Sequence, residues 1–146
     1  MRRFPAGVAV ATVELDGERL GLTLGSVVSL SLEPPLVGVS ISRGAAIHEY
    51  LRRSDGFALS LLGEGQAALA QHFARGAPPL IAWVGVATRA GSVAPLLDEA
   101  LGWLECRHWA AFDTGDHTFF IGQVVHVEVG SLDAPLLYLD GAYTGL

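Results

Sequence analysis

Apolar and polar positions follow a pattern along the chain that predicts a β-rich fold. Residues 7–14 are rich in small and β-branched side chains, and Asp16-Gly17 after them is a pair typical of two-residue hairpin turns. Residues 20–32 read as a second strand with its continuation, which Pro34-Pro35 interrupts. Residues 36–42 then read as a buried strand. These segments together predict an antiparallel β unit.

Two short segments carry a helical spacing instead. Residues 45–53 and residues 66–74 place apolar side chains four positions apart, which favours one helix in each. Residues 76–79, rich in glycine and proline, are expected to end the second helix. A short strand over residues 57–62 separates the two helices, and short strands are expected near residues 83–88.

The last third of the chain has the clearest strand pattern. Residues 101–112 alternate, so we expect two faces along one strand. One face would carry Trp103, Glu105, Arg107 and Trp109, and the other Leu104, Cys106, His108 and Phe112. The elements expected after it are a turn at 113–116, a long strand at 117–129, a turn at 130–135 and a final strand at 136–139.

Many strands with two short inserted helices predict a mainly β fold. No repeat, linker or low-complexity tract divides the chain, so residues 1–146 are expected to form a single domain. A closed or nearly closed barrel is the natural way to remove the exposed edges of such a sheet.

Composition adds an expectation about assembly. Hydrophobic residues make up 51% of the chain and charged residues only 16%, yet no apolar run approaches the roughly 18 residues needed to span a bilayer. We therefore expect no membrane span. The surplus apolar surface is expected to lie in a subunit interface, because obligate interfaces resemble a divided core.

Charge and cysteine content narrow the class of protein further. The chain has a net charge of −6 and no run of basic residues, so we expect no nucleic-acid partner. The single Cys106 excludes an intrachain disulfide, no targeting segment is recognised, and both features suit the cytoplasm. No Cys/His spacing indicates a metal site.

The segment 21–37 is unusual because it places hydroxyl side chains in an apolar stretch. Thr23, Ser26, Ser29 and Ser31 need hydrogen-bond partners if they are buried. They could border a planar polar ring system such as an isoalloxazine, which needs polar contacts along its edge and apolar contacts on its faces. Alternatively, they bond locally to the backbone.

Two further segments have the chemistry to meet an anionic ligand. Residues 40–46 join a strand to a predicted helix, and Arg43 beside the helix N-terminus could bind a phosphate. The alternative is a capped helix with a solvated arginine. His117 stands where a turn enters a strand, where it could carry charge toward an anionic cofactor or simply pair with Asp116.

Nothing in the residues indicates chemistry without a cofactor. There is no nucleophile–base pair, carboxylate pair or metal triad, and Cys106 is expected to be a core residue. His48 and His72 are expected on helix surfaces. Asp140-Gly141 at the C-terminus could be a hairpin turn anchored by Tyr143.

Taken in order, the segments resemble the flavin reductase-like family with the FMN-binding split-barrel fold. The matching stretches cover nearly the whole chain: Arg3–Val8, Gly21–Val37, Phe57–Leu62, Leu69–Ala74, Leu104–Cys106, Gly115–Val124 and Pro135–Tyr138. The resemblance implies a homodimeric enzyme that uses NADH or NADPH to reduce FMN or FAD. It also implies a possible monooxygenase partner that consumes the reduced flavin.

The resemblance also implies a set of site residues. His117 would face the nicotinamide side of the site. The flavin contacts would be Thr23, Leu24, Gly25, Ser26, Ser29, Ser40, Ser42, Arg43, Ala45 and Ser60.

Three positions depart from the family pattern. Gly25 stands where a serine is common, Ser60 replaces a frequent asparagine, and Gly44-Ala45 replaces a serine-rich pair. Each change would remove a polar contact of about 0.5–1.5 kcal/mol. The flavin would then bind more weakly, as a substrate rather than as a fixed prosthetic group. Alternatively, the site has drifted from the family's function.

Two rival interpretations follow. The chain could be a non-catalytic or electron-carrying FMN-binding protein, which would stay yellow through purification yet not oxidise NAD(P)H. It could also be a flavin-free split barrel that binds haem or a deazaflavin.

Overall fold

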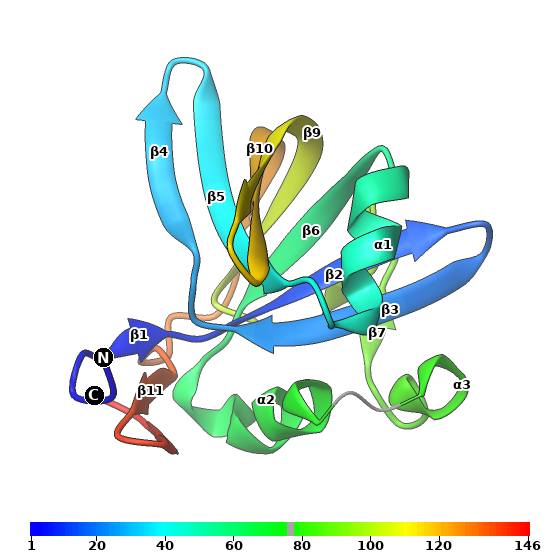
Figure 1. Cartoon of the computed structure of the whole chain (residues 1–146). Coiled ribbons are helices and arrows are strands. Elements are labelled where there is room, and N and C mark those ends of the chain that lie inside the picture. Colours follow the sequence, from blue (N-terminus) through cyan, green and yellow to red (C-terminus); the bar gives the residue numbers. More distant parts are fainter. Residues whose placement is uncertain (76–77) are drawn as a thin grey trace.

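A seven-stranded antiparallel sheet dominates the computed structural model, which describes residues 1–75 and 78–146 (Figure 1). Its strands follow the order β3-β2-β6-β9-β10-β5-β4. Their bounds are β2 (Ala9–Leu15), β3 (Glu18–Leu24), β4 (Val28–Leu32), β5 (Pro35–Ser42), β6 (Gly56–Leu61), β9 (Gly102–Thr114) and β10 (His117–Val129). The protein is therefore mainly β, as its sequence pattern predicts.

Smaller elements complete the described part of the chain. A three-stranded sheet of β1 (Ala6–Gly7), β11 (Leu137–Leu139) and β12 (Ala142–Thr144) brings the two termini side by side (Figure 1). Strands β7 (Thr88–Arg89) and β8 (Leu96–Leu97) pair separately. The helices are α1 (Ala46–Arg53), η1 (Glu64–Gln66, a 3-10 turn), α2 (Ala67–Ala74) and α3 (Pro79–Ala82).

Contrary to the prediction from the sequence pattern, the strands of the first 42 residues do not all pair with one another in a single antiparallel unit. The hairpin turn at Asp16-Gly17 is confirmed, because both residues have a positive φ, at 53° and 79°. However, the expected continuation of the second strand breaks at Gly25–Val27. Strand β3 pairs with β2, and strand β4 pairs with β5. The consecutive strands β3 and β4 therefore lie at opposite ends of the sheet order.

The main core explains how those opposite ends are related. Leu20 and Leu24 of β3 pack in the same buried cluster as Val39 and Ile41 of β5. Because strands from both ends of the order share one core, the sheet must curve around it. Helix α1 adds Ile47 and Leu51 to this cluster and so covers one side of the core.

A β-bulge overturns part of the predicted alternation in β9. Ile121 of β10 pairs with Ala110 but Gly122 pairs with His108, which leaves Trp109 as an extra residue in β9. The side chains beyond the bulge therefore exchange faces. Phe112 was expected on the same face as Cys106, but it pairs with Phe119 on the opposite face and is 56% exposed.

The predicted helices form, with corrections at the edges. His48 was expected on a helix surface but is buried against β10, where its Nε2 lies 2.7 Å from the hydroxyl of Thr118. The sequence pattern missed α3. Residues 83–85 form a turn, and the strand expected near residues 83–88 forms as β7, at Thr88–Arg89. Of the segment 76–79 expected to end α2, Gly76 and Ala77 lie outside the described residues.

Cys106 lies in the core, as expected. Its side chain is fully buried, and burial, together with the neighbouring Glu105, raises the pKa of the thiol to about 12. The thiol therefore stays protonated near neutral pH and serves as a packing residue. Among the residues that the structure describes, no helix is long and apolar enough to cross a membrane.

Candidate functional site

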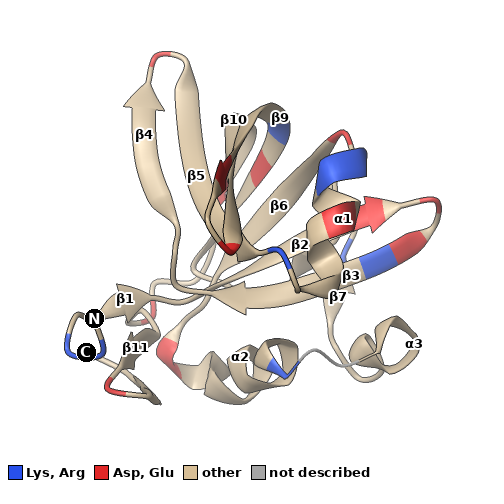
Figure 2. Ribbon diagram, in the orientation of Figure 1, with Lys and Arg blue, Asp and Glu red and all other residues tan. Residues whose placement is uncertain are grey.

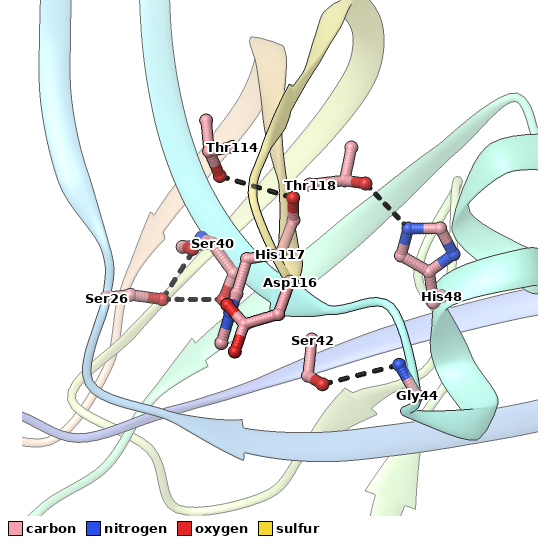
Figure 3. A network of polar contacts seen from close by, with 9 residues as sticks. All are labelled: Ser26, Ser40, Ser42, Gly44, His48, Thr114, Asp116, His117 and Thr118. Carbon is pink, nitrogen blue, oxygen red and sulfur yellow. Dashed lines mark hydrogen bonds and ion pairs between the residues drawn. The ribbon is translucent and has the colours of Figure 1, made fainter.

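The connection between β3 and β4 is tied to strand β5 by one serine. The hydroxyl of Ser26 accepts a hydrogen bond from the backbone N–H of Ser40 and donates one to the Ser40 carbonyl, both at 3.1 Å (Figure 3). Ser26 thus satisfies backbone groups that a neighbouring strand would otherwise pair. The loop Gly25–Val27 is held against β5 as a result.

Strand β5 presents polar side chains on the face away from the core. Ser40 and Ser42 are two residues apart and share this face, whereas Val39 and Ile41 are buried on the other. His117 of β10 stands directly opposite Ser42 in the ladder. Ser26, Ser40, Ser42 and His117 therefore form a continuous group, which we call the polar row.

The polar row ends at the N-terminus of α1. The Gly44 N–H donates to the Ser42 hydroxyl at 3.3 Å, and the Ala45 N–H donates to the Ser42 carbonyl at 3.0 Å. Ala45 occupies the N-cap and has no side-chain oxygen to accept from the first turn of the helix. The helix start therefore offers N–H groups and partial positive charge to an external anion, with the exposed Arg43 beside it.

The hairpin tip between β9 and β10 places His117 beside that helix start. Gly115 has a φ of +79°, a left-handed conformation that suits glycine in this turn. The Arg43 N–H donates to the Asp116 carbonyl at 2.9 Å, which joins the tip to the strand–helix junction.

His117 also pairs with Asp116, which was the alternative role expected from the sequence. Its Nδ1 lies 2.7 Å from Asp116 Oδ1, and this hydrogen bond holds the pKa of the Asp116 carboxyl below its ordinary value (Figure 3). The imidazole is still 42% exposed on the polar face. Pairing with Asp116 therefore orients the ring without hiding it.

A large apolar cavity opens at the other end of the polar row. It has a volume of about 840 Å³, and Gly25, Ser26 and Val27 form part of its wall. The rest of its wall comes mainly from the two chain ends, with Phe4, Pro5, Ala6, Gly7, Pro135, Leu136 and Tyr138, and from Leu61, Leu62 and Leu101. Such cavities, with a few polar groups, are typical of small-molecule sites.

Four of the expected flavin contacts lie outside this arrangement. The Thr23 hydroxyl donates to the Ala70 carbonyl of α2 at 2.6 Å, and Leu24 is a core residue. Ser29 is exposed on β4. Ser60 is fully buried and accepts a hydrogen bond from the Leu97 N–H at 3.1 Å. The structure therefore groups Gly25, Ser26, Ser40, Ser42, Arg43, Ala45 and His117, but not these four.

The local role of Ser60 gives a simple prediction. Ser60→Ala should lower the free energy of unfolding by about 1–3 kcal/mol, because the Leu97 N–H would remain buried without a partner. The affinity for FMN should not change. Urea unfolding and fluorescence titration measure the two quantities, and Ser29→Ala at an exposed position is the control for stability. A weaker affinity with unchanged stability would instead assign Ser60 to the ligand site.

The residue pattern alone missed the apolar cavity. Its wall joins residues 4–9 to residues 135–138, which come together only when β1 pairs with β11. The one signal available was the family resemblance, in which both stretches are matching segments.

The chain is similar to known proteins along its whole length. The family described as "Flavin reductase like domain" matches residues 1–146. The reductase component of 4-hydroxyphenylacetate 3-monooxygenase from Thermus thermophilus is 39% identical over 146 residues, covering all of this chain and 92% of the relative. An NADH:FMN oxidoreductase from Rhodococcus erythropolis is 36% identical over 98% of this chain and 77% of its own length.

Solved structures show the same fold. An NADH:FAD oxidoreductase from Streptomyces globisporus superposes with a TM-score of 0.93 at 34% identity, over 99% of this chain and 87% of the other. The flavin reductase PheA2 superposes with a TM-score of 0.91 at 34% identity, over 100% and 93%. The chain therefore belongs to the flavin reductase-like domain family.

Proposed function

We propose that this protein is an NAD(P)H-dependent flavin reductase that moves a hydride from a nicotinamide to FMN or FAD. The proposal rests on the order of three features in space. The apolar cavity lies at one end of the polar row, and the uncapped start of α1 lies at the other end. These three parts match a flavin in order, since the ring is largely apolar, the ribityl chain carries hydroxyls and the phosphate is an anion.

The residues present fit a flavin at each of these parts. The cavity walls would contact the faces of the ring, while Ser26 and Ser40 would meet the ribityl hydroxyls. Ser42, Arg43 and the N–H groups at the start of α1 would hold the phosphate. Gly44 leaves room there, because a Cβ at this position would meet only the Ser42 hydroxyl, at 3.8 Å.

The chemistry of hydride transfer belongs to the bound flavin and nicotinamide, since no side chain can supply it. The task of the protein is to hold the two ligands in reacting geometry and to exclude water. His117 would orient the nicotinamide nucleotide, because its exposed imidazole lies in the polar row beside Ser42.

The choice between a tight cofactor and an exchangeable substrate follows from the departures at Gly25 and Gly44-Ala45. Both lie at the site and lack the hydroxyls that a serine would add, so we propose that the flavin exchanges during turnover. The departure at Ser60 has no bearing on this, because Ser60 contacts Leu97. An exchangeable reduced flavin would be used by a separate monooxygenase in the cytoplasm.

We further propose that two copies assemble as a homodimer of split barrels. Strands β4 and β5 carry no charged residue, as Figure 2 shows, and β4 exposes three large apolar side chains, Val28, Leu30 and Leu32. Trp109, Phe112 and Val127 add exposed apolar surface on β9 and β10. Monomeric proteins rarely expose so much apolar surface on neighbouring strands.

Sedimentation analysis tests the assembly. We expect a dimer for the wild-type protein, and Leu30→Asp should shift it toward monomer if this surface is buried between the copies. Leu80→Asp, at an exposed residue of α3, is the matched control. A wild-type monomer at micromolar concentration would contradict the dimer proposal.

The activity itself is tested by steady-state oxidation of NADH and NADPH by the pure protein with FMN, FAD and riboflavin. We expect oxidation that depends on both the flavin and the protein. Oxidation no faster than the free-flavin background with all three flavins would overturn the proposed function.

A further inference from the structure

A chain of hydrogen bonds, buried at His48 and Thr118, joins helix α1 to the hairpin of β9 and β10. His48 Nε2 lies 2.7 Å from Thr118 Oγ1, and that hydroxyl donates to Asp113 Oδ1 at 3.2 Å. A threonine hydroxyl has one proton, which here goes to Asp113, so His48 Nε2 must be the donor in the first bond. The chain therefore runs in one direction, from His48 through Thr118 to Asp113.

Burial protects the hydrogen bond between His48 and Thr118 from competition by water. Thr118 is fully buried and His48 is 9% exposed, so neither group can exchange its partner for bulk water. The His48 ring also packs edge-on against Phe120, with a centroid distance of 5.5 Å. These contacts leave the imidazole of His48 few alternative orientations.

A second contact repeats the connection one helical turn later. Arg52 follows His48 by four residues and therefore lies on the same face of α1. Its guanidinium is 3.9 Å from Asp113 Oδ1, the atom that ends the hydrogen-bond chain. The helix thus meets the hairpin at two points, Thr118 through His48 and Asp113 through Arg52.

The hairpin held in this way is the one that presents His117. Thr118 follows His117 directly and points to the opposite face of β10, so its anchor fixes the backbone on which His117 stands (Figure 3). The tip has two further contacts, the Arg43 N–H on the Asp116 carbonyl at 2.9 Å and the Thr114 hydroxyl on the His117 carbonyl at 3.2 Å, and both lie among exposed residues. The bond to His48 is the buried anchor nearest to His117.

We propose that His48 and Thr118 are positioning residues that fix His117 relative to the phosphate-binding end of α1. His48 stands in the first turn of the helix whose N-terminus would hold the phosphate, and its partner Thr118 adjoins the residue that would orient the nicotinamide. The inference rests on the proposed function. Since hydride transfer requires a defined geometry between the two ligands, this anchor sets part of that geometry.

The test replaces the hydroxyl of Thr118 with a methyl group. Thr118→Val keeps the shape of the side chain and should lower kcat/KM for NADH about tenfold while changing the FMN dissociation constant less than about twofold. Thr118→Ser restores the hydroxyl and should recover most of the activity. Ser60→Ala is the matched control, because it also breaks a buried hydroxyl bond but lies away from the hairpin.

A spectroscopic readout separates positioning from stability and does not depend on turnover. In NMR spectra, the imidazole signals of His117 should shift in Thr118→Val and not in Ser60→Ala. Asp113→Ala provides a milder variant that should fold, because this side chain is 61% exposed. It should shift the His117 signals in the same direction by a smaller amount.

The outcomes distinguish this inference from the proposed function. An active wild-type protein whose kcat/KM and His117 signals are unchanged in Thr118→Val and Asp113→Ala would overturn the positioning role. Effects equal to those of Ser60→Ala would also overturn it, because they would report only lost stability. An inactive wild-type protein would defeat the proposed function, while the His117 signals would still decide whether His48 and Thr118 position that residue.

Discussion

Replacing Arg43 with alanine is expected to weaken FMN binding about ten- to hundredfold and to leave riboflavin binding nearly unchanged. Arg43 is separated from the N-cap Ala45 of α1 only by Gly44, and its exposed side chain can reach an anion at the helix start. Hydrogen bonds to charged groups contribute about 1.5–3 kcal/mol, which corresponds to this range of affinity. Riboflavin lacks the phosphate, so its affinity should not change when Arg43 is replaced.

Calorimetric titration of both flavins measures this difference. Arg53→Ala is the matched control, because Arg53 is an exposed arginine at the opposite end of the same helix, where it lies 3.8 Å from Asp16. This variant should bind FMN as the wild type does. If Arg43→Ala weakened FMN and riboflavin equally, the phosphate would have to bind elsewhere.

The second large effect is expected at His117. His117→Ala should raise the KM for NADH about tenfold and change the FMN dissociation constant less than about twofold. The Asp116 carboxylate engages Nδ1, so the second ring nitrogen, Nε2, is the one that can meet a nucleotide on the polar face. Loss of one hydrogen bond to a charged group has about this effect on binding.

Initial-rate kinetics at saturating FMN, with a separate flavin titration, resolve the two effects. His126→Ala is the control, because His126 is an exposed histidine on the same strand. Its KM should match that of the wild type. Loss of flavin binding in His117→Ala would make His117 a flavin or structural residue and remove it from the nicotinamide side.

The sequence pattern could predict local elements well and their arrangement less well. The bounds of β10 and the turn at Asp16-Gly17 follow directly from alternation and turn chemistry. The separation of β3 from β4 could not be read from alternation, because the break at Gly25–Val27 depends on Ser26 bonding to the distant Ser40. The exposed Phe112 was misplaced for a related reason, since a bulge at Trp109 leaves no periodic signal.

The candidate site could also be predicted only in part from the sequence. Arg43, Ala45 and Ser42 could be predicted together because they are close in the sequence and flank one helix start. Their proximity to His117 required the pairing of β5 with β10. Hydroxyl residues such as Thr23 and Ser60 were indistinguishable from ligand contacts until their partners, Ala70 and Leu97, were known.

The most direct test of the central claim is anaerobic mixing of the protein and FMN with NADH, followed by the loss of oxidised-flavin absorbance. The account predicts that flavin is reduced at least about a hundredfold faster than in the same mixture without protein, because the site brings two ligands into reacting geometry. The result that would contradict it is binding of FMN without faster reduction by either NADH or NADPH. That outcome would identify a flavin-binding protein that carries no reductase activity.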